Sequence, residues 1–186
     1  MRIIAGEARG RPIVAPRGDE TRPALDRTRE SIFAILGDAA EGAAVLDLFA
    51  GSGAFGLEAL SRGAHSALFI ENSASAIRAL ERNLADLGFE GRATVLRTDA
   101  LRNPAPADGE SYELVFFDPP FALFGDPRTA ARLASRVEEI LAGLLAQGGT
   151  LVVRLPERQK IEIGVAPDDR RAFGASDVLF FSGGTR

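Results

Sequence analysis

Short apolar segments alternate with helical segments along most of this chain. Continuous apolar stretches predict five strands, at residues 45–49, 67–71, 93–97, 114–117 and 150–155. Helices are expected between them: one ending at Arg62, one capped by Asn72 or Ser73 and stopped by Gly88, and one over Arg128–Leu145. Strands that are apolar throughout are buried on both faces, as in a parallel sheet covered by helices. The predicted fold class is therefore α/β, with a Rossmann-like, mostly parallel, doubly wound sheet.

Both ends of the chain predict additions to this sheet. Residues 1–36 are expected to form an extension: a short hairpin that turns near Glu7–Gly10, and a helix that Asp26 caps and Gly37 ends. The apolar face of this helix is predicted to comprise Ile32, Phe33, Ile35 and Leu36. At the other end, the alternating Ile161, Ile163 and Val165 and the apolar run Val178–Phe181 predict an antiparallel hairpin at one sheet edge, with Asp168–Arg171 as a solvated turn.

Composition limits the class of protein. The 186 residues, 46% of them hydrophobic, suffice for one buried core, so we expect a single domain spanning residues 1–186. We find no apolar stretch long enough to cross a membrane and no secretory signal, and we expect a soluble, cytoplasmic protein. Because there is no cysteine, disulfides, thiolate metal sites and iron–sulfur clusters are excluded, and we expect no metal.

Positive charge is concentrated near the N-terminus. The formal net charge of −4 argues against a protein that coats nucleic acid through its overall field. Seven arginines nevertheless lie within the first thirty residues. Arginine both stacks on bases and forms bidentate hydrogen bonds to phosphates. Arg9, Arg11, Arg22 and Arg29 are therefore candidate substrate contacts. The alternative, that they are salt-bridged structural residues, stays open because acidic residues are interspersed among them.

A glycine-rich turn follows the first predicted strand. Gly51, Gly53 and Gly56 lie where the strand passes into a helix, a place where the backbone can approach a nucleotide-like ligand closely. The spacing also fits the dinucleotide fingerprint, so a nicotinamide-dependent dehydrogenase is a rival interpretation. Asp47, four residues before the first glycine, would repel a pyrophosphate but suit the cationic amine and sulfonium of S-adenosylmethionine.

Two more acids follow the next two predicted strands. Glu71 can accept hydrogen bonds from a ribose diol, and Asp99 can accept one from an adenine amine. Each acid alone could be a helix cap, but three acids at three successive strand ends indicate one site. The residues expected to bind S-adenosylmethionine are Asp47, Phe49, Gly51, Ser52, Gly53, Glu71, Asn72, Asp99 and Ala100.

A second motif, Asp118-Pro119-Pro120-Phe121, follows the fourth predicted strand directly. Proline has no N–H, so the segment presents acceptors, the Asp118 carboxylate and the Pro119 carbonyl. Two acceptors on an exocyclic base amine would turn its nitrogen lone pair toward a methyl donor. Phe121 is expected to stack on the extruded base. These four residues are the predicted catalytic group. Without cysteine, the chain lacks the thiolate that methylation at pyrimidine carbon 5 normally requires.

Over essentially its whole length, the chain resembles the RsmD-type 16S rRNA guanine-N2 methyltransferases, which have the class I methyltransferase fold. The resemblance rests on Arg2–Gly6 with Arg9–Arg11, Arg22-Pro23 with Asp26–Glu30, Asp47–Gly63, and the Asp-Pro-Pro-Phe motif at 118–121. It implies methyl transfer from S-adenosylmethionine to N2 of a guanine in small-subunit rRNA, within an assembling subunit, with the N-terminal hairpin on the RNA. This chain departs from the family pattern at Glu7, at Ala24-Leu25 and at Ala175-Ser176.

Other interpretations stay open at this point. The glycine turn and the Asp-Pro-Pro-Phe motif also fit N-methyltransferases of DNA adenine or cytosine and of protein glutamine. A ribosome-assembly module whose methylation is incidental is a further alternative. We expect a monomer, with no membrane contact.

Overall fold

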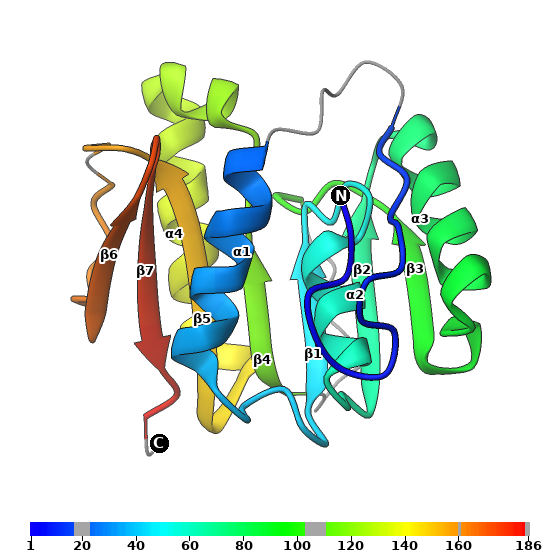
Figure 1. Cartoon of the computed structure of the whole chain (residues 1–186). Helices are drawn as coiled ribbons and strands as arrows, with labels where there is room; N and C mark the ends of the chain where they lie inside the picture. Colours follow the sequence, from blue (N-terminus) through cyan, green and yellow to red (C-terminus); the bar gives the residue numbers. More distant parts are fainter. Residues whose placement is uncertain (17–22, 103–110, 160, 185–186) are drawn as a thin grey trace.

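The computed structural model describes the chain except residues 17–22, 103–110, 160 and 185–186, and it leaves the side chains of residues 23–25 undescribed. Seven strands form one sheet in the order β3-β2-β1-β4-β5-β7-β6 (Figure 1). Their bounds are β1 (Ala44–Leu48), β2 (Ser66–Glu71), β3 (Ala93–Arg97), β4 (Tyr112–Phe117), β5 (Leu145–Pro156), β6 (Asp169–Phe173) and β7 (Ser176–Ser182). Strands β1 to β5 are parallel, whereas β7 runs antiparallel to both β5 and β6. The predicted α/β fold with a C-terminal hairpin is confirmed.

Helices cover both faces of the sheet. On one face lie α1 (Pro23–Leu36), α2 (Ala54–Ser61) and α3 (Ala74–Leu87), and on the other lies α4 (Pro127–Gly143) (Figure 1). Successive residues of a strand point to opposite faces, so Phe116 packs in the cluster under the first three helices and Phe117 in the cluster under α4. Burial on both faces explains why β1, β2, β4 and the second half of β5 read as continuous apolar segments.

Local signals place α3 as predicted. Ser73 is its N-cap, with its hydroxyl accepting from the backbone N–H of Ala76 at 3.5 Å. Gly88 ends the helix in the left-handed conformation, with φ +77°, which glycine adopts without strain. The N-terminal residues also double back as predicted, because the backbone N–H of Ile3 donates to the carbonyl of Arg11 and that of Gly10 donates to the carbonyl of Ile3, each at 2.9 Å.

Two predictions about α1 are wrong. The helix begins at Pro23, three residues before the predicted cap, because proline suits the first helical turn. Asp26 therefore lies in that turn, where its carboxylate is 3.2 Å from the Arg29 guanidinium. Ile35, predicted to face the core, is 44% exposed, whereas Ile32 and Phe33 are fully buried.

The first arm of the C-terminal hairpin was also assigned wrongly. Residues 161–165 are not a strand, although Ile161 and Ile163 pack against the cluster under α4. Their alternation reflects packing of an irregular segment, which the N–H of Gly164 ties to Glu138 of α4 at 2.7 Å. The true arm is β6, which includes Asp169 to Arg171, predicted to be a turn. As an edge strand with an exposed face, β6 accommodates charged side chains.

No helix in the described parts of the chain is long and apolar enough to cross a lipid bilayer.

Candidate functional site

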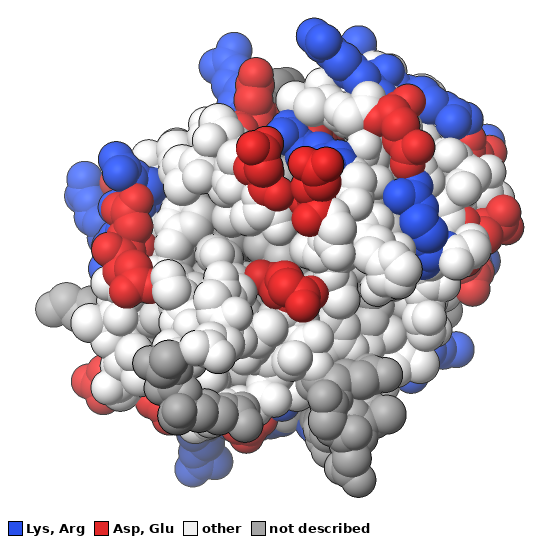
Figure 2. Space-filling view, turned by 90° about the horizontal axis from the view of Figure 1, so that it is seen from below, with Lys and Arg blue, Asp and Glu red and all other residues white. Residues whose placement is uncertain are grey.

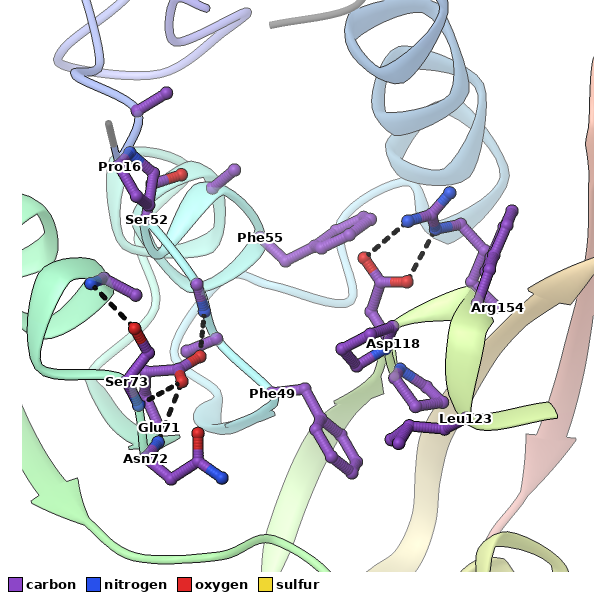
Figure 3. Close-up of a pocket in the computed structure, with 18 of the residues that line it drawn as sticks. Pro16, Phe49, Ser52, Phe55, Glu71, Asn72, Ser73, Asp118, Leu123 and Arg154 are labelled. Carbon is purple, nitrogen blue, oxygen red and sulfur yellow. Dashed lines mark hydrogen bonds and ion pairs between the residues drawn. The ribbon is translucent and has the colours of Figure 1, made fainter. Parts of the chain in front are cut away.

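A cavity of about 1170 Å³ opens at the carboxyl ends of the parallel strands. It is lined by residues of the glycine turn after β1, by the acid that ends β2 and by the motif after β4. Parts of α1 and α4 also line it. Figure 3 shows Glu71 and Asp118 on opposite sides of this space, with Phe49 and Phe55 between them. Parallel topology produces this arrangement because the carboxyl ends of neighbouring strands meet at one edge of the sheet.

Most of the predicted site residues line this cavity. They are Phe49, Gly51, Ser52, Glu71, Asn72, Asp99, Asp118, Pro119, Pro120, Phe121 and Arg29. Asp47, Gly53, Ala100, Arg9 and Arg11 are not among its lining residues. Arg22 lies outside the described residues. Sequence reasoning missed other lining residues, among them Arg154, Phe55 and Ser73.

The glycine turn is held by carboxylates. The N–H of Gly51 donates to Glu71 at 2.8 Å, and the N–H of Gly56 donates to Asp47 at 2.9 Å. Gly53 has φ +81°, and a Cβ there would lie 2.3 Å from Leu80 of α3, so only glycine lets the turn pack this closely. The turn thus uses two of its donors internally, on acids.

Glu71, at the end of β2, is the acceptor of three backbone hydrogen bonds. Besides Gly51, its carboxylate accepts from the N–H groups of Asn72 and Ser73, each at 2.8 Å (Figure 3). A carboxylate has about four acceptor positions, so at least one remains for a ligand hydroxyl. Asp99, beyond β3, accepts from the N–H of Leu101 at 3.0 Å and keeps acceptor capacity in the same way.

Asp47 lies beneath the turn, not on the cavity wall. It is 1% exposed, and one oxygen accepts from Gly56. Burial raises the pKa of Asp47 well above its usual range, the Gly56 hydrogen bond opposes this, and the nearby Asp118 and Glu71 carboxylates raise the pKa further. Its predicted contact with the cofactor therefore stays a prediction, while its contact with the turn is direct.

Asp118, at the end of β4, is bound by an arginine from the adjacent strand. Arg154 of β5 donates from Nε to Oδ1 at 2.7 Å and from Nη2 to Oδ2 at 3.0 Å (Figure 3). Its guanidinium also lies over the ring of Phe121, 4.8 Å from the centroid. Burial raises the pKa of Asp118, and the Arg154 charge and hydrogen bonds oppose that rise. The sequence signal for Arg154 is that it is the one charged residue of its strand.

These contacts bear on which cofactor fits. A dinucleotide needs free backbone N–H groups and the positive end of a helix at its pyrophosphate. Here the N–H of Gly51 is taken by Glu71, and two further carboxylates, Asp99 and Asp118, line the cavity. Carboxylates at the ends of these strands disfavour a neighbouring pyrophosphate but suit a ligand with a ribose diol, an amine and a positive sulfonium. This set of acceptors therefore fits S-adenosylmethionine.

The N-terminal arginines divide into two kinds. Arg29 is 2% exposed and donates to the carbonyl of Arg2 at 2.5 Å. Arg11 donates to the carbonyls of Asp86 and Leu87 at the end of α3. Both thus have structural partners, whereas Arg9 is exposed. Glu7, one departure from the family pattern, pairs with Arg92.

Comparison with known proteins finds a family and relatives for this chain. The family model described as conserved hypothetical protein 95 matches residues 1–181. A Bacillus subtilis protein provisionally named rRNA methyltransferase YlbH is 41% identical over 65% of this chain and 67% of its own length. Ribosomal RNA small subunit methyltransferase D of Escherichia coli is 44% identical over 65% of this chain. This alignment spans 60% of the Escherichia coli protein's length.

Solved structures show the same fold. One from Escherichia coli, provisionally titled methyltransferase yhhF, superposes with a TM-score of 0.82 at 32% identity and covers 100% of this chain and 99% of that one. The 16S rRNA N2 G1207 methyltransferase RsmC of Thermus thermophilus, solved with AdoMet and guanosine, has a TM-score of 0.70 at 22% identity. The superposition covers 89% of this chain and 44% of that one, and it shows a likeness of fold alone. The chain therefore belongs to the family described as conserved hypothetical protein 95, and it is an RsmD-type methyltransferase.

Proposed function

We propose that this protein transfers a methyl group from S-adenosylmethionine to the exocyclic N2 amine of a guanine in small-subunit rRNA. The observation that carries the proposal is the position of the Asp118 carboxylate, which lies in the same cavity as Glu71 and Asp99. One side of the cavity offers acceptors for a nucleoside, and the other offers acceptors for an amine (Figure 3). Family membership supports methylation of rRNA, and the residues of the 118–121 motif support an amine as the acceptor group.

The cofactor side is assigned to the ends of β1, β2 and β3. Glu71 accepts from the ribose hydroxyls, Asp99 accepts from the adenine amine, and Phe49 supplies an apolar wall. The remaining expected contacts are Gly51, Ser52, Asn72 and Ala100, with Asp47 and Gly53 holding the turn from beneath. When bound, S-adenosylmethionine supplies an electrophilic methyl group on a positive sulfur.

The substrate side is assigned to the 118–121 motif. The Asp118 carboxylate and the Pro119 carbonyl accept the two N–H hydrogens of the guanine amine, which directs the nitrogen lone pair toward the methyl carbon. Pro120 keeps the segment rigid, and Phe121 offers a ring face for the base. Formation of the N–C bond would break the sulfur–methyl bond and leave S-adenosylhomocysteine as a neutral thioether. The methylated amine becomes more acidic, and its extra proton would leave through Asp118 to solvent. No metal or strong base is needed for this step.

RNA is proposed to approach over the cavity end of the molecule. Figure 2 shows the opposite end, where blue and red groups are interspersed and acidic groups lie near the middle of the view. The described residues of that face form no broad basic surface for a phosphate backbone. Arg132 of α4 is exposed at the cavity. Arg9 is exposed on the turn of the N-terminal arm (residues 1–16), and this turn packs on the ends of α2 and α3 and not on the cavity wall. Because the chain carries a net charge of −4, ribosomal proteins of an assembling subunit are proposed to supply part of the docking surface to a cytoplasmic, monomeric enzyme.

The test is incubation with tritiated S-adenosylmethionine and undermethylated small subunits, followed by nuclease digestion and identification of the labelled nucleoside. Labelled N2-methylguanosine that is lost in Asp118→Ala but kept in Glu81→Ala, an exposed α3 control, would support the proposal. Parallel reactions with duplex DNA and with protein extract test the other N-methyltransferase classes. Label in DNA or protein alone would overturn the RNA assignment, and equal labelling of protein-free rRNA would overturn the role of ribosomal proteins.

A further inference from the structure

The pair between Asp118 and Arg154 is a two-point contact within the cavity. Both guanidinium-to-carboxylate bonds are short, at 2.7 and 3.0 Å, and the side chains are only 19% and 13% exposed. A planar guanidinium that donates two parallel hydrogen bonds fixes the orientation of the carboxylate plane, which an ammonium cannot do. The orientation of Asp118 is therefore set by a residue on another strand.

Arg154 is itself held from two further sides. Its Nη1 donates to the hydroxyl of Ser176, the first residue of β7, at 3.1 Å. Its guanidinium rests on the ring of Phe121, which belongs to the same motif as Asp118. One side chain thus connects the C-terminal hairpin to both ends of the 118–121 motif.

The two-point contact with Arg154 leaves acceptor capacity on Asp118. Each carboxylate oxygen has two acceptor positions, and Arg154 occupies one on each oxygen. A substrate N–H can therefore bind while Arg154 stays in place. The Arg154 charge also favours the ionised carboxylate, the form that accepts without donating.

We propose that Arg154 is a positioning residue for methyl transfer, holding the Asp118 carboxylate ionised and aimed at the substrate amine while it backs the ring of Phe121. This inference rests on the proposed function, because it assigns Arg154 a role through Asp118. It also restricts the base to the face of Phe121 that the guanidinium leaves uncovered.

The charge of Arg154 affects the ionisation of Asp118. Burial raises the pKa of Asp118, and Arg154 opposes that rise by its charge and its hydrogen bonds. Asp118 in turn raises the pKa of Asp47 on β1. Other charged side chains that line the cavity are Glu71 at the end of β2, Asp99 beyond β3, Arg29 on α1 and Arg132 on α4. Removing Arg154 therefore leaves Asp118 among carboxylates without its bound cation.

Two substitutions separate charge from geometry. Arg154→Gln removes both the charge and the two-point contact, whereas Arg154→Lys keeps the charge but loses the two-point contact. We expect each to lower kcat about 100-fold, the loss that small misplacements of reacting groups can produce. The affinity for S-adenosylmethionine, measured by calorimetry, should stay within about twofold of wild type. Arg171→Gln, which breaks an exposed pair with Asp169 on β6, is the matched control and should leave kcat unchanged.

The pH profile of kcat distinguishes positioning from a merely structural role. Activity needs the Asp118 carboxylate, so it falls as pH drops through the pKa of Asp118. In Arg154→Gln that pKa is higher, and the acidic limb should move to higher pH; in Arg154→Lys the limb should stay near its wild-type position. An unchanged kcat in Arg154→Gln, a raised kcat, or a loss without movement of the limb would overturn the proposal.

A titration without substrate keeps this test independent of the proposed function. In protein labelled with ¹³C at aspartate carboxyls, the Asp118 resonance is assigned by comparison with Asp118→Asn. Its titration midpoint should be higher in Arg154→Gln than in wild type and unchanged in Arg171→Gln. Equal midpoints in wild type and Arg154→Gln would refute the inference even if RNA is methylated. A shift without any RNA methylation would instead refute the proposed function and leave the pairing intact.

Discussion

Arg29 and Glu58 face each other in the interior, with Arg29 Nε 3.8 Å from a Glu58 oxygen and both side chains almost fully buried, at 2% and 0% exposure. Glu58 of α2 also accepts from the backbone N–H groups of Ile4 and Ala5, at 2.8 and 3.1 Å, and pairs with Arg62 at 2.8 Å. One carboxylate therefore attaches the N-terminal arm and α1 to the helix that follows the glycine turn.

Glu58→Ala should destabilise the fold. The substitution leaves Arg29 buried without this counter-charge and leaves two backbone donors unpaired, and loss of one partner of a buried pair costs about 3–5 kcal/mol. Chemical denaturation measures the change in the free energy of unfolding. Glu81→Ala, at an exposed position on α3, should change it by no more than about 0.5 kcal/mol. Equal stabilities of the two variants would contradict the buried network.

Arg9 and Arg11 should behave differently despite their proximity. Arg11→Ala removes the guanidinium from the last carbonyls of α3 and should cost about 1 kcal/mol of stability, the usual value of such a contact. Arg9→Ala should leave stability unchanged but weaken RNA binding, reducing the salt dependence of log K by about one unit if Arg9 contacts a phosphate. Denaturation and binding titrations at several salt concentrations measure both effects; a stability loss in Arg9→Ala would show that its role is structural.

Glu71→Ala should weaken cofactor binding. The carboxylate holds Gly51, Asn72 and Ser73 by their N–H groups and is proposed to accept from the ribose. Charge-assisted hydrogen bonds contribute about 1.5–3 kcal/mol each, so the Kd for S-adenosylmethionine should rise about 10- to 100-fold. Calorimetric titration measures this Kd. Exposed Glu90 provides the matched control, because Glu90→Ala should bind as wild type does; the same affinity in Glu71→Ala would exclude Glu71 from the site.

Asp47→Asn should change how stability depends on pH. Because burial raises the pKa of Asp47 in the folded state, the folded protein binds more protons than the unfolded chain at pH values between the unfolded pKa, about 3.9, and that raised pKa. Wild type should therefore gain stability relative to Asp47→Asn as pH falls from the raised folded-state pKa toward the unfolded pKa. Denaturant midpoints for both proteins across this interval measure the difference. A difference that stays constant would mean that Asp47 is ionised at the same pH in both states.

The sequence determined the sheet and most of the cavity. Continuous apolar runs identified β1, β2, β4 and β5 because their residues pack on both faces, and local capping identified the ends of α3 at Ser73 and Gly88. Position after a strand was enough to bring Glu71, Asp99 and Asp118 to one edge, because parallel strands present their carboxyl ends together. These inferences needed only neighbours along the chain and the topology that follows from them.

Tertiary structure alone decided which polar groups pair. Asp118 and Arg154 lie 36 residues apart, and only the pairing of β4 with β5 makes them partners. Tertiary structure also decided the partners of Arg11, which donates to a carbonyl at the end of α3, and of Asp47, which accepts from the N–H of Gly56. The alternation at residues 161–165 predicted a strand, but the antiparallel partner of β7 at the sheet edge is instead β6. Long-range hydrogen bonds and edge pairing depend on three-dimensional neighbours, which local sequence patterns do not specify.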